Sequence, residues 1–141
     1  MDAQPIIQAL QTEGFRITKA RALTIAIFQS HHLPITELEL RRQLAKKGIR
    51  VNKSTVYREL EFLLSREIVI EVNFGDGKKR YELNGRHHHH IICTNCKKVD
   101  DIHIANDLSA VEKKIQKQKK FKVQSHALEF FGLCSSCVKL R

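Results

Sequence analysis

Apolar residues recur every three to four positions through the first 65 residues, which is the spacing of helices that bury one face. Capping residues divide this pattern into four predicted helices. Thr18 can cap the second helix, and Thr36 with Glu39 forms a capping box for the third. The four segments are one around Ile6, Ile7 and Leu10 that ends near Gly14, one after Thr18, one from Thr36 to Gly48, and one from Asn52 or Ser54 to Ser65.

Two strand-like runs follow the helices. They span residues 68–74 and 80–83 and are joined by Gly75-Asp76-Gly77, a sequence typical of a hairpin turn. A hairpin after two helices joined by a short turn predicts a winged helix, in which the fourth helix enters the DNA major groove and the basic wing tip, residues 78–80, meets phosphates. The residues expected to face DNA on that helix are Lys53, Thr55, Tyr57 and Arg58. The alternative is a helical scaffold whose basic residues only keep it soluble.

The second half combines shorter strands with one helix. Residues 99–103 have the pattern of a short strand, residues 104–115 that of an amphipathic helix, and residues 121–133 that of a long strand, apolar on both faces near its end. A partner is expected to cover such a sheet, because a helix-turn-helix usually reads paired half-sites as a dimer. The pattern predicts an α+β chain, with a winged helix-turn-helix DNA-binding domain in residues 1–83 and a small α/β dimerisation and metal-binding domain in residues 84–141.

All four cysteines lie in two Cys-x-x-Cys pairs, Cys93 with Cys96 and Cys134 with Cys137. Two such turns supply the four thiolates of a tetrahedral structural zinc site. The alternatives are two disulfides or a redox motif. Both are disfavoured, because no secretory signal precedes the domain and no thioredoxin-like pattern surrounds either pair.

An unbroken run of histidines, residues 87–90, leads into the apolar pair Ile91 and Ile92. If this segment is extended, His87 and His89 point to one side and His88 and His90 to the other. Each pair could then begin a separate metal site. Imidazole with carboxylate suits zinc, iron, manganese or nickel, and the ligand types do not choose among them.

Charge and hydropathy narrow the class of protein. The chain has 141 residues, 42% of them hydrophobic, and a net charge of +10, which favours a globular protein with a polyanionic partner. No apolar stretch approaches the roughly 20 residues that span a bilayer, and the N-terminus lacks an export signal, so we expect a cytoplasmic protein without a membrane partner. A zinc deaminase needs His-x-Glu ahead of Pro-Cys-x-x-Cys, and the chain has neither. We therefore expect no enzyme activity and no small-molecule substrate.

Several segments together resemble the ferric uptake regulator family of bacterial metal-responsive transcription factors, across nearly the whole chain. They are Phe15-Arg-Ile-Thr-Lys-Ala-Arg21, Ser54-Thr-Val-Tyr-Arg-Glu-Leu60, Arg80-Tyr-Glu-Leu-Asn84, residues 87–96, Phe121-Lys-Val with His126, and Gly132-Leu-Cys-x-x-Cys137. Each segment alone is a weak signal, but the combination is highly specific. The resemblance implies a metal-dependent regulator, normally a repressor, that binds a double-stranded DNA operator as a homodimer or tetramer.

The resemblance also implies roles for individual residues. Tyr57 and Arg58 match a DNA-contacting pair, Arg16 matches a basic residue that approaches the minor groove, and the four cysteines match structural zinc ligands. The regulatory metal ligands would be Glu82, His88, His90 and Asp101, with a histidine from the DNA-binding domain. Closing that site between the domains would hold the two reading heads at a spacing that suits DNA. An additional site, found in some members, would use His87, His89, His126 and an acid from the long helix.

The chain departs from the family pattern in both histidine-containing sites. The hinge histidine position falls near Pro34, with His31 and His32 just before it. We take His32 as the ligand, and the alternative is that both are solvent-exposed loop residues. In the additional site the aligned helix position is Ser109, so we take Glu112, about one turn later, as the acid.

The sensed metal is expected to be Fe²⁺. The chain has no fifth cysteine of the kind that zinc sensors use, and Glu82 stands where peroxide sensors tend to carry aspartate. Zn²⁺ or Mn²⁺ sensing, peroxide sensing, and a constitutive zinc-stabilised DNA-binding protein are the alternatives. His103 could join either histidine site or lie on the surface.

Overall fold

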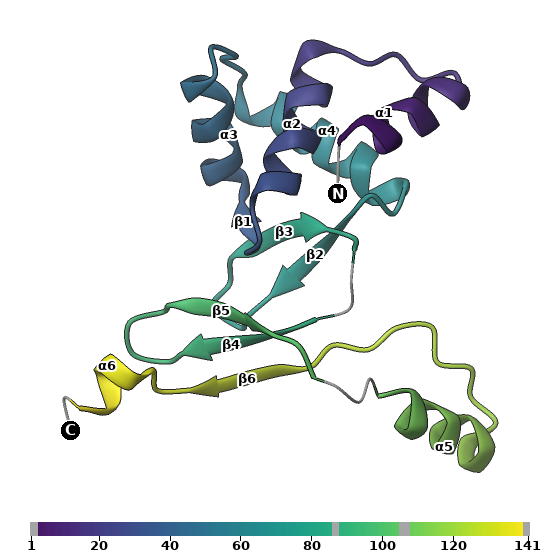
Figure 1. The fold of residues 1–141 in the computed structure, drawn as a ribbon, viewed down its shortest axis with the longest axis vertical. Coiled ribbons are helices and arrows are strands. Elements are labelled where there is room, and N and C mark those ends of the chain that lie inside the picture. Colours follow the sequence, from purple (N-terminus) through teal and green to yellow (C-terminus); the bar gives the residue numbers. More distant parts are fainter. Residues whose placement is uncertain (1–2, 86–87, 105–107, 140–141) are drawn as a thin grey trace. The chain divides into compact units, whose positions relative to one another are not determined.

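The computed structural model describes residues 3–85, 88–104 and 108–139 (Figure 1). The chain divides into two compact units, Met1–Gly85 and Arg86–Arg141. Each unit contains helices and one three-stranded sheet. The mixed α+β architecture predicted from the sequence is confirmed.

Four helices form most of the first unit, and capping side chains set where they begin. The Thr18 side chain accepts a hydrogen bond from the N–H of Arg21, and Thr36 and Glu39 form the predicted capping box. Asn52, one of the two predicted starts of the fourth helix, caps it through the N–H of Thr55. The helices are α1 (Ala3–Thr12), α2 (Lys19–Ser30), α3 (Glu37–Lys46) and α4 (Lys53–Ser65).

A small sheet completes the first unit. Its strands are β1 (Ile35–Thr36), β2 (Val69–Asn73) and β3 (Lys79–Leu83), in the order β1-β3-β2, with both pairings antiparallel. One hydrophobic cluster joins sheet and helices, and it includes Phe28, Leu40, Leu60, Val69 and Tyr81. The β2–β3 hairpin, which follows α4 and lies below the helices in Figure 1, is the predicted wing.

The wing turn depends on two glycines. Gly75 and Gly77 have φ angles of +73° and +74°, in the left-handed region where a β-carbon would be strained. The side chains of Asn73 and Asp76 accept hydrogen bonds from the N–H groups of Gly75 and Lys78, which closes the turn.

The second unit is built on a sheet in the order β5-β4-β6. Its elements are β4 (His89–Cys93), β5 (Val99–Ile102), α5 (Ser109–Lys119), β6 (Glu129–Gly132) and α6 (Ser135–Val138). β4 pairs antiparallel with β5 and parallel with β6. Among the described residues of this unit, the buried apolar side chains are Ile92, Cys93 and Cys137, so the unit has only a small hydrophobic core of its own.

Two predicted boundaries in this unit are wrong. A long strand was expected over residues 121–133, but only β6 forms. The backbone of β4 pairs with residues 129–132 alone, and a strand needs hydrogen bonds to a neighbouring strand. The helix expected from residue 104 begins at Ser109, with Leu108 as its N-cap. Within the described residues, no helix is long and apolar enough to cross a membrane.

Candidate metal centres and nucleic-acid interface

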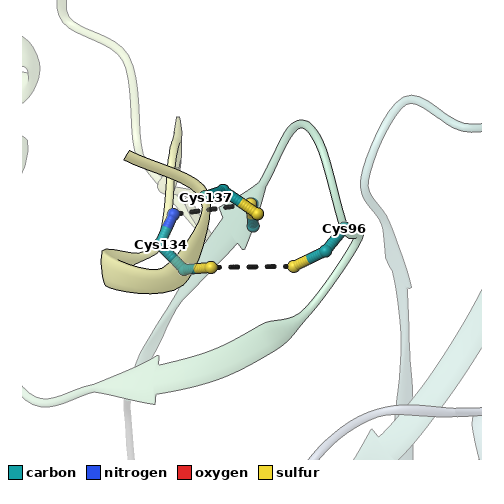
Figure 2. Close-up of side chains that lie close together, drawn as sticks. Cys96, Cys134 and Cys137 are labelled. Atoms are coloured by element: carbon teal, nitrogen blue, oxygen red, sulfur yellow. Dashed lines mark hydrogen bonds between the residues drawn. The ribbon is translucent and has the colours of Figure 1, made fainter. Parts of the chain in front are cut away.

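The four cysteines converge on one point at the end of the second unit's sheet. Cys93 ends β4, and Cys96 lies in the turn after it. Cys134 directly precedes α6, and Cys137 lies within it (Figure 2). All four Sγ atoms lie within 4.8 Å of one another. The Sγ atoms of Cys96 and Cys134 are 3.7 Å apart, against the edge of about 3.8 Å in a tetrahedron with zinc–sulfur bonds of about 2.3 Å. The cluster therefore fits a structural zinc ion.

Hydrogen bonds shift the pKa of three thiols in this cluster, two of them towards the thiolate form. A bond from the backbone N–H of Cys134, 3.4 Å from the sulfur, lowers the pKa of the Cys93 thiol to about 6. A bond from the N–H of Cys137 lowers the pKa of Cys134. The N–H of Lys98 lowers the pKa of Cys96, but the thiols of Cys93 and Cys134 outweigh it and the pKa rises to about 11. Thiolate is the form that binds zinc, and all four cysteines are free rather than disulfide-bonded.

The described histidines of the run, His88, His89 and His90, alternate between two faces, as the sequence predicted for an extended segment. The rings of His88 and His90 lie on one face with centroids 4.9 Å apart, and His90 is buried. Asp101 pairs with His90 across the β4–β5 ladder, so its side chain starts from the same face. The ring of His103 lies 6.2 Å from that of His88. Three residues of the predicted regulatory set thus share one face of the second unit.

A second group forms on the opposite face. The buried ring of His89 lies 5.8 Å from that of His126. The Nδ1 atom of His126 is 2.7 Å from a carboxylate oxygen of Glu112 on α5. Three of the four residues predicted for the additional site are therefore neighbours, and the fourth, His87, lies outside the described residues.

The remaining regulatory candidates belong to the first unit. Glu82 is buried in β3. His31 caps the C-terminus of α2, with its Nδ1 atom 3.2 Å from the carbonyl oxygen of Ile27, whereas His32 is exposed in the loop that follows.

The predicted DNA-reading residues occupy the first turns of α4. Lys53 and Arg58 are exposed, and Thr55 and Tyr57 are half-buried beside the core residue Val56. The ammonium group of Lys53 lies 5.6 Å from the centre of the Tyr57 ring. Exposed donors at a helix N-terminus are well suited to phosphates and base edges.

Arg21 is a structural residue beside the predicted DNA-reading residues that sequence reasoning missed. Its guanidinium binds both carboxylate oxygens of Glu59 on α4, at 2.7 and 3.0 Å, and lies 3.6 Å over the Phe62 ring. It also donates a 2.9 Å hydrogen bond to the carbonyl oxygen of Arg16. Arg21 therefore links α2, α4 and the segment that carries exposed Arg16. No local pattern indicates a pair 38 residues apart.

The wing tip is less available to phosphates than its sequence suggested. The side chain of Arg80 is only 14% exposed, binds both carboxylate oxygens of Asp76, and lies 5.0 Å from the centre of the Phe74 ring. Its hydrogen bonds hold the pKa of Asp76 far below the usual range. Lys79 pairs with Glu71 at 3.0 Å, which leaves exposed Lys78 as the best-placed cation of the three.

Comparison with known proteins agrees with this arrangement. Residues 12–131 match the model of the ferric uptake regulator family. The chain is 33% identical to the ferric uptake regulation protein of Bacillus subtilis over 139 residues, covering 94% of this chain and 91% of that one. It is also 33% identical to the peroxide-responsive repressor PerR of Staphylococcus epidermidis over 131 residues, covering 93% and 87%. The structure of the ferric uptake regulator of Francisella tularensis with iron superposes with a TM-score of 0.73 at 26% identity, covering 89% of this chain and 96% of that one. The chain belongs to the ferric uptake regulator family of metal-responsive transcription regulators.

Proposed function

We propose that the chain is an iron-responsive, DNA-binding transcriptional repressor of metal homeostasis that acts as a homodimer on double-stranded operators. The observation that carries the proposal is that the two units contain different kinds of site. The first presents a winged helix with exposed cations. The second holds a thiol tetrahedron and, separately, histidine-rich faces.

The two kinds of site take different metals in this proposal. The thiol cluster of Cys93, Cys96, Cys134 and Cys137 holds zinc permanently, because four thiolates leave no open position and bind zinc tightly. The regulatory site takes Fe²⁺ through imidazole and carboxylate ligands, which suit exchangeable divalent metals. Its ligands are Glu82, His88, His90 and Asp101, with His32 as the hinge ligand.

Metal binding would act on DNA affinity by joining the two units. Glu82 and His32 belong to the first unit, and His88 and His90 belong to the second. A metal that needs ligands from both favours the arrangements in which the units are close. DNA contacts would then come from Arg16, Lys53, Thr55, Tyr57 and Arg58, with Arg21 fixing the Arg16 segment against α4.

A homodimer follows from the apolar side chains that the second unit leaves exposed. Ile91, Phe130 and Phe131 are 40%, 43% and 53% exposed on its small sheet. A second copy of the chain is the partner that a two-fold operator requires. The same surface supports a tetramer only if a further apolar patch is buried, which sedimentation would reveal.

Peroxide sensing is the second candidate, because the chain is as similar to a peroxide-responsive repressor as to a ferric uptake regulation protein. Both candidates use iron, but only peroxide sensing oxidises the protein. The additional site of His89, His126 and Glu112 is proposed as a separate divalent-metal site in either case.

The test is metal stoichiometry combined with DNA selection. Purified protein is assayed for metal by elemental analysis before and after mild chelation, and an operator is selected from random duplexes under anaerobic Fe²⁺. We expect one retained zinc and a removable metal whose return restores binding to the selected duplex, with Mn²⁺ and Zn²⁺ as comparison metals. DNA affinity indifferent to the removable metal would instead indicate a constitutive zinc-stabilised DNA-binding protein. Loss of binding after dilute peroxide, only in the iron-loaded form, would identify the second candidate.

A further inference from the structure

We propose that His103 is a ligand of the sensed metal in this chain, so that β4 and the end of β5 supply three imidazoles and one carboxylate from a single unit. The inference rests on the proposed function, because it concerns the metal assigned to His88 and His90. It adds a ligand to that site from the end of β5.

Strand register brings the four side chains together. In the antiparallel β4–β5 pair, His89 lies opposite Ile102 and His90 opposite Asp101. One further step in the same register places His88 opposite His103, directly after the end of β5. Alternate residues of a strand share a face, and cross-strand neighbours start about 5 Å apart. Two cross-strand pairs therefore form a two-by-two array on one face.

The measured contacts agree with that array. The ring centroids of His88 and His90 are 4.9 Å apart, and those of His88 and His103 are 6.2 Å apart. The Nε2 atom of His103 lies 3.9 Å from a carboxylate oxygen of Asp101. His103 thus lies next to both kinds of ligand in the set, an imidazole (His88) and a carboxylate (Asp101).

Burial gives the array an anchored part and an adjustable part. His90 is only 4% exposed, so its position is set by packing. The side chains of Asp101 and His103 are 35% and 69% exposed, which gives them room to turn towards a metal held by the inner histidines. Imidazole and carboxylate are both ligands that suit a borderline divalent ion.

The hinge candidates are less favourable than His103. His32 is exposed in a loop of the other unit, and the Nδ1 atom of His31 is already 3.2 Å from the carbonyl oxygen of Ile27. His103 directly follows the strand paired with β4, so the chain loses less conformational entropy when His103 binds the metal than when a residue of a separate unit does. Metal affinity is then expected to depend more on His103 than on His32.

Cobalt is a suitable probe, because its visible absorption reports affinity and coordination together. Full-length protein whose thiol site is filled with one zinc is titrated with Co²⁺ as wild type and as His103→Ala and His90→Ala. Asp100→Asn is the matched control for Asp101→Asn, because Asp100 starts from the opposite face of β5. Zinc content and circular dichroism confirm that each variant is folded.

We expect His103→Ala and Asp101→Asn to weaken Co²⁺ binding at least about tenfold and to change the visible spectrum. A tenfold loss is the lower end of the range seen when residues that hydrogen-bond to metal ligands are replaced. Asp100→Asn should titrate as wild type. A His103→Ala protein with wild-type affinity and spectrum, while His90→Ala loses the metal, would overturn the inference alone. If His90→Ala also titrates as wild type, the regulatory site of the proposed function fails as well.

Discussion

Replacing Arg21 by alanine should destabilise the first unit by about 3 kcal/mol. The change removes a guanidinium that binds both oxygens of Glu59 and covers the Phe62 ring. Exposed ion pairs contribute about 0.2–1 kcal/mol, and removal of one partner of a fully buried pair costs about 3–5 kcal/mol. The Arg21 and Glu59 side chains are 15% and 17% exposed, so about 2 kcal/mol is a reasonable intermediate for the ion pair. The lost cation–π contact adds about 1 kcal/mol.

The chain contains a matched control for this estimate. Arg66 pairs with Glu13 at 3.4 Å and lies 4.3 Å over the Phe15 ring, so it has the same two kinds of partner. Its side chain and that of Glu13 are 43% and 52% exposed, so water screens the pair. Arg66→Ala should therefore cost about 1 kcal/mol or less.

Tyrosine fluorescence makes the assay specific to the first unit. The chain has two tyrosines, Tyr57 and Tyr81, and no tryptophan. Urea unfolding of zinc-loaded protein would be followed at these residues for wild type, Arg21→Ala, Glu59→Gln, the double variant and Arg66→Ala. We expect a coupling energy above about 1 kcal/mol between positions 21 and 59. Equal losses in Arg21→Ala and Arg66→Ala would refute the argument that burial sets the strength of the pair.

Other predictions concern the cap, the wing and the histidines. Thr36→Ala should cost about 1 kcal/mol in the same tyrosine assay, because it removes the capping box of α3, and an unchanged midpoint would contradict that role. Lys78→Ala should reduce the slope of the logarithm of the DNA-binding constant against the logarithm of salt concentration by about 0.9. Arg80→Ala should leave that slope unchanged, because Arg80 is bound to Asp76. Equal slopes for the two variants would count against this assignment. His90→Ala should keep one zinc per chain and lose the metal of the regulatory site, which elemental analysis before and after mild chelation would check.

The parts of this structure that the sequence predicted are those set by local chemistry. Thr18 and Thr36 mark helix starts because a capping hydroxyl acts within one turn. The alternation of the histidine run follows from strand geometry once the segment is extended. The cysteine cluster was predictable although Cys93 and Cys134 are 41 positions apart in the sequence, only because four thiolates have few other uses in such a chain.

The parts that were not predictable depend on which strands and helices become neighbours. β6 is short because β4 pairs with only four residues of the segment 121–133, and no local pattern of that segment indicates the limit. The position of His103 opposite His88 depends on the register of β4 and β5, which the turn between them sets. Arg21 could not be recognised, because its partner Glu59 lies on another helix and both residues read as ordinary surface positions.

β4 belongs both to the zinc cluster and to the sensing face, the face of the sheet that carries His90 and Asp101. We therefore expect metal binding at the sensing face to depend on the zinc, but zinc binding not to depend on the sensing face. Cys93 ends β4, three residues after His90, and the cluster holds the β4–β5 turn and α6 at the end of the sheet. The same turn fixes the register that brings Asp101 beside His90. Because the second unit buries few apolar side chains, zinc must supply much of its folding free energy. Cys96→Ser should therefore lose both the zinc and the Co²⁺ site, while tyrosine fluorescence still reports a folded first unit. His90→Ala should lose only the Co²⁺ site, and a Cys96→Ser protein that binds Co²⁺ with wild-type affinity and spectrum would show that the sensing face forms without the zinc.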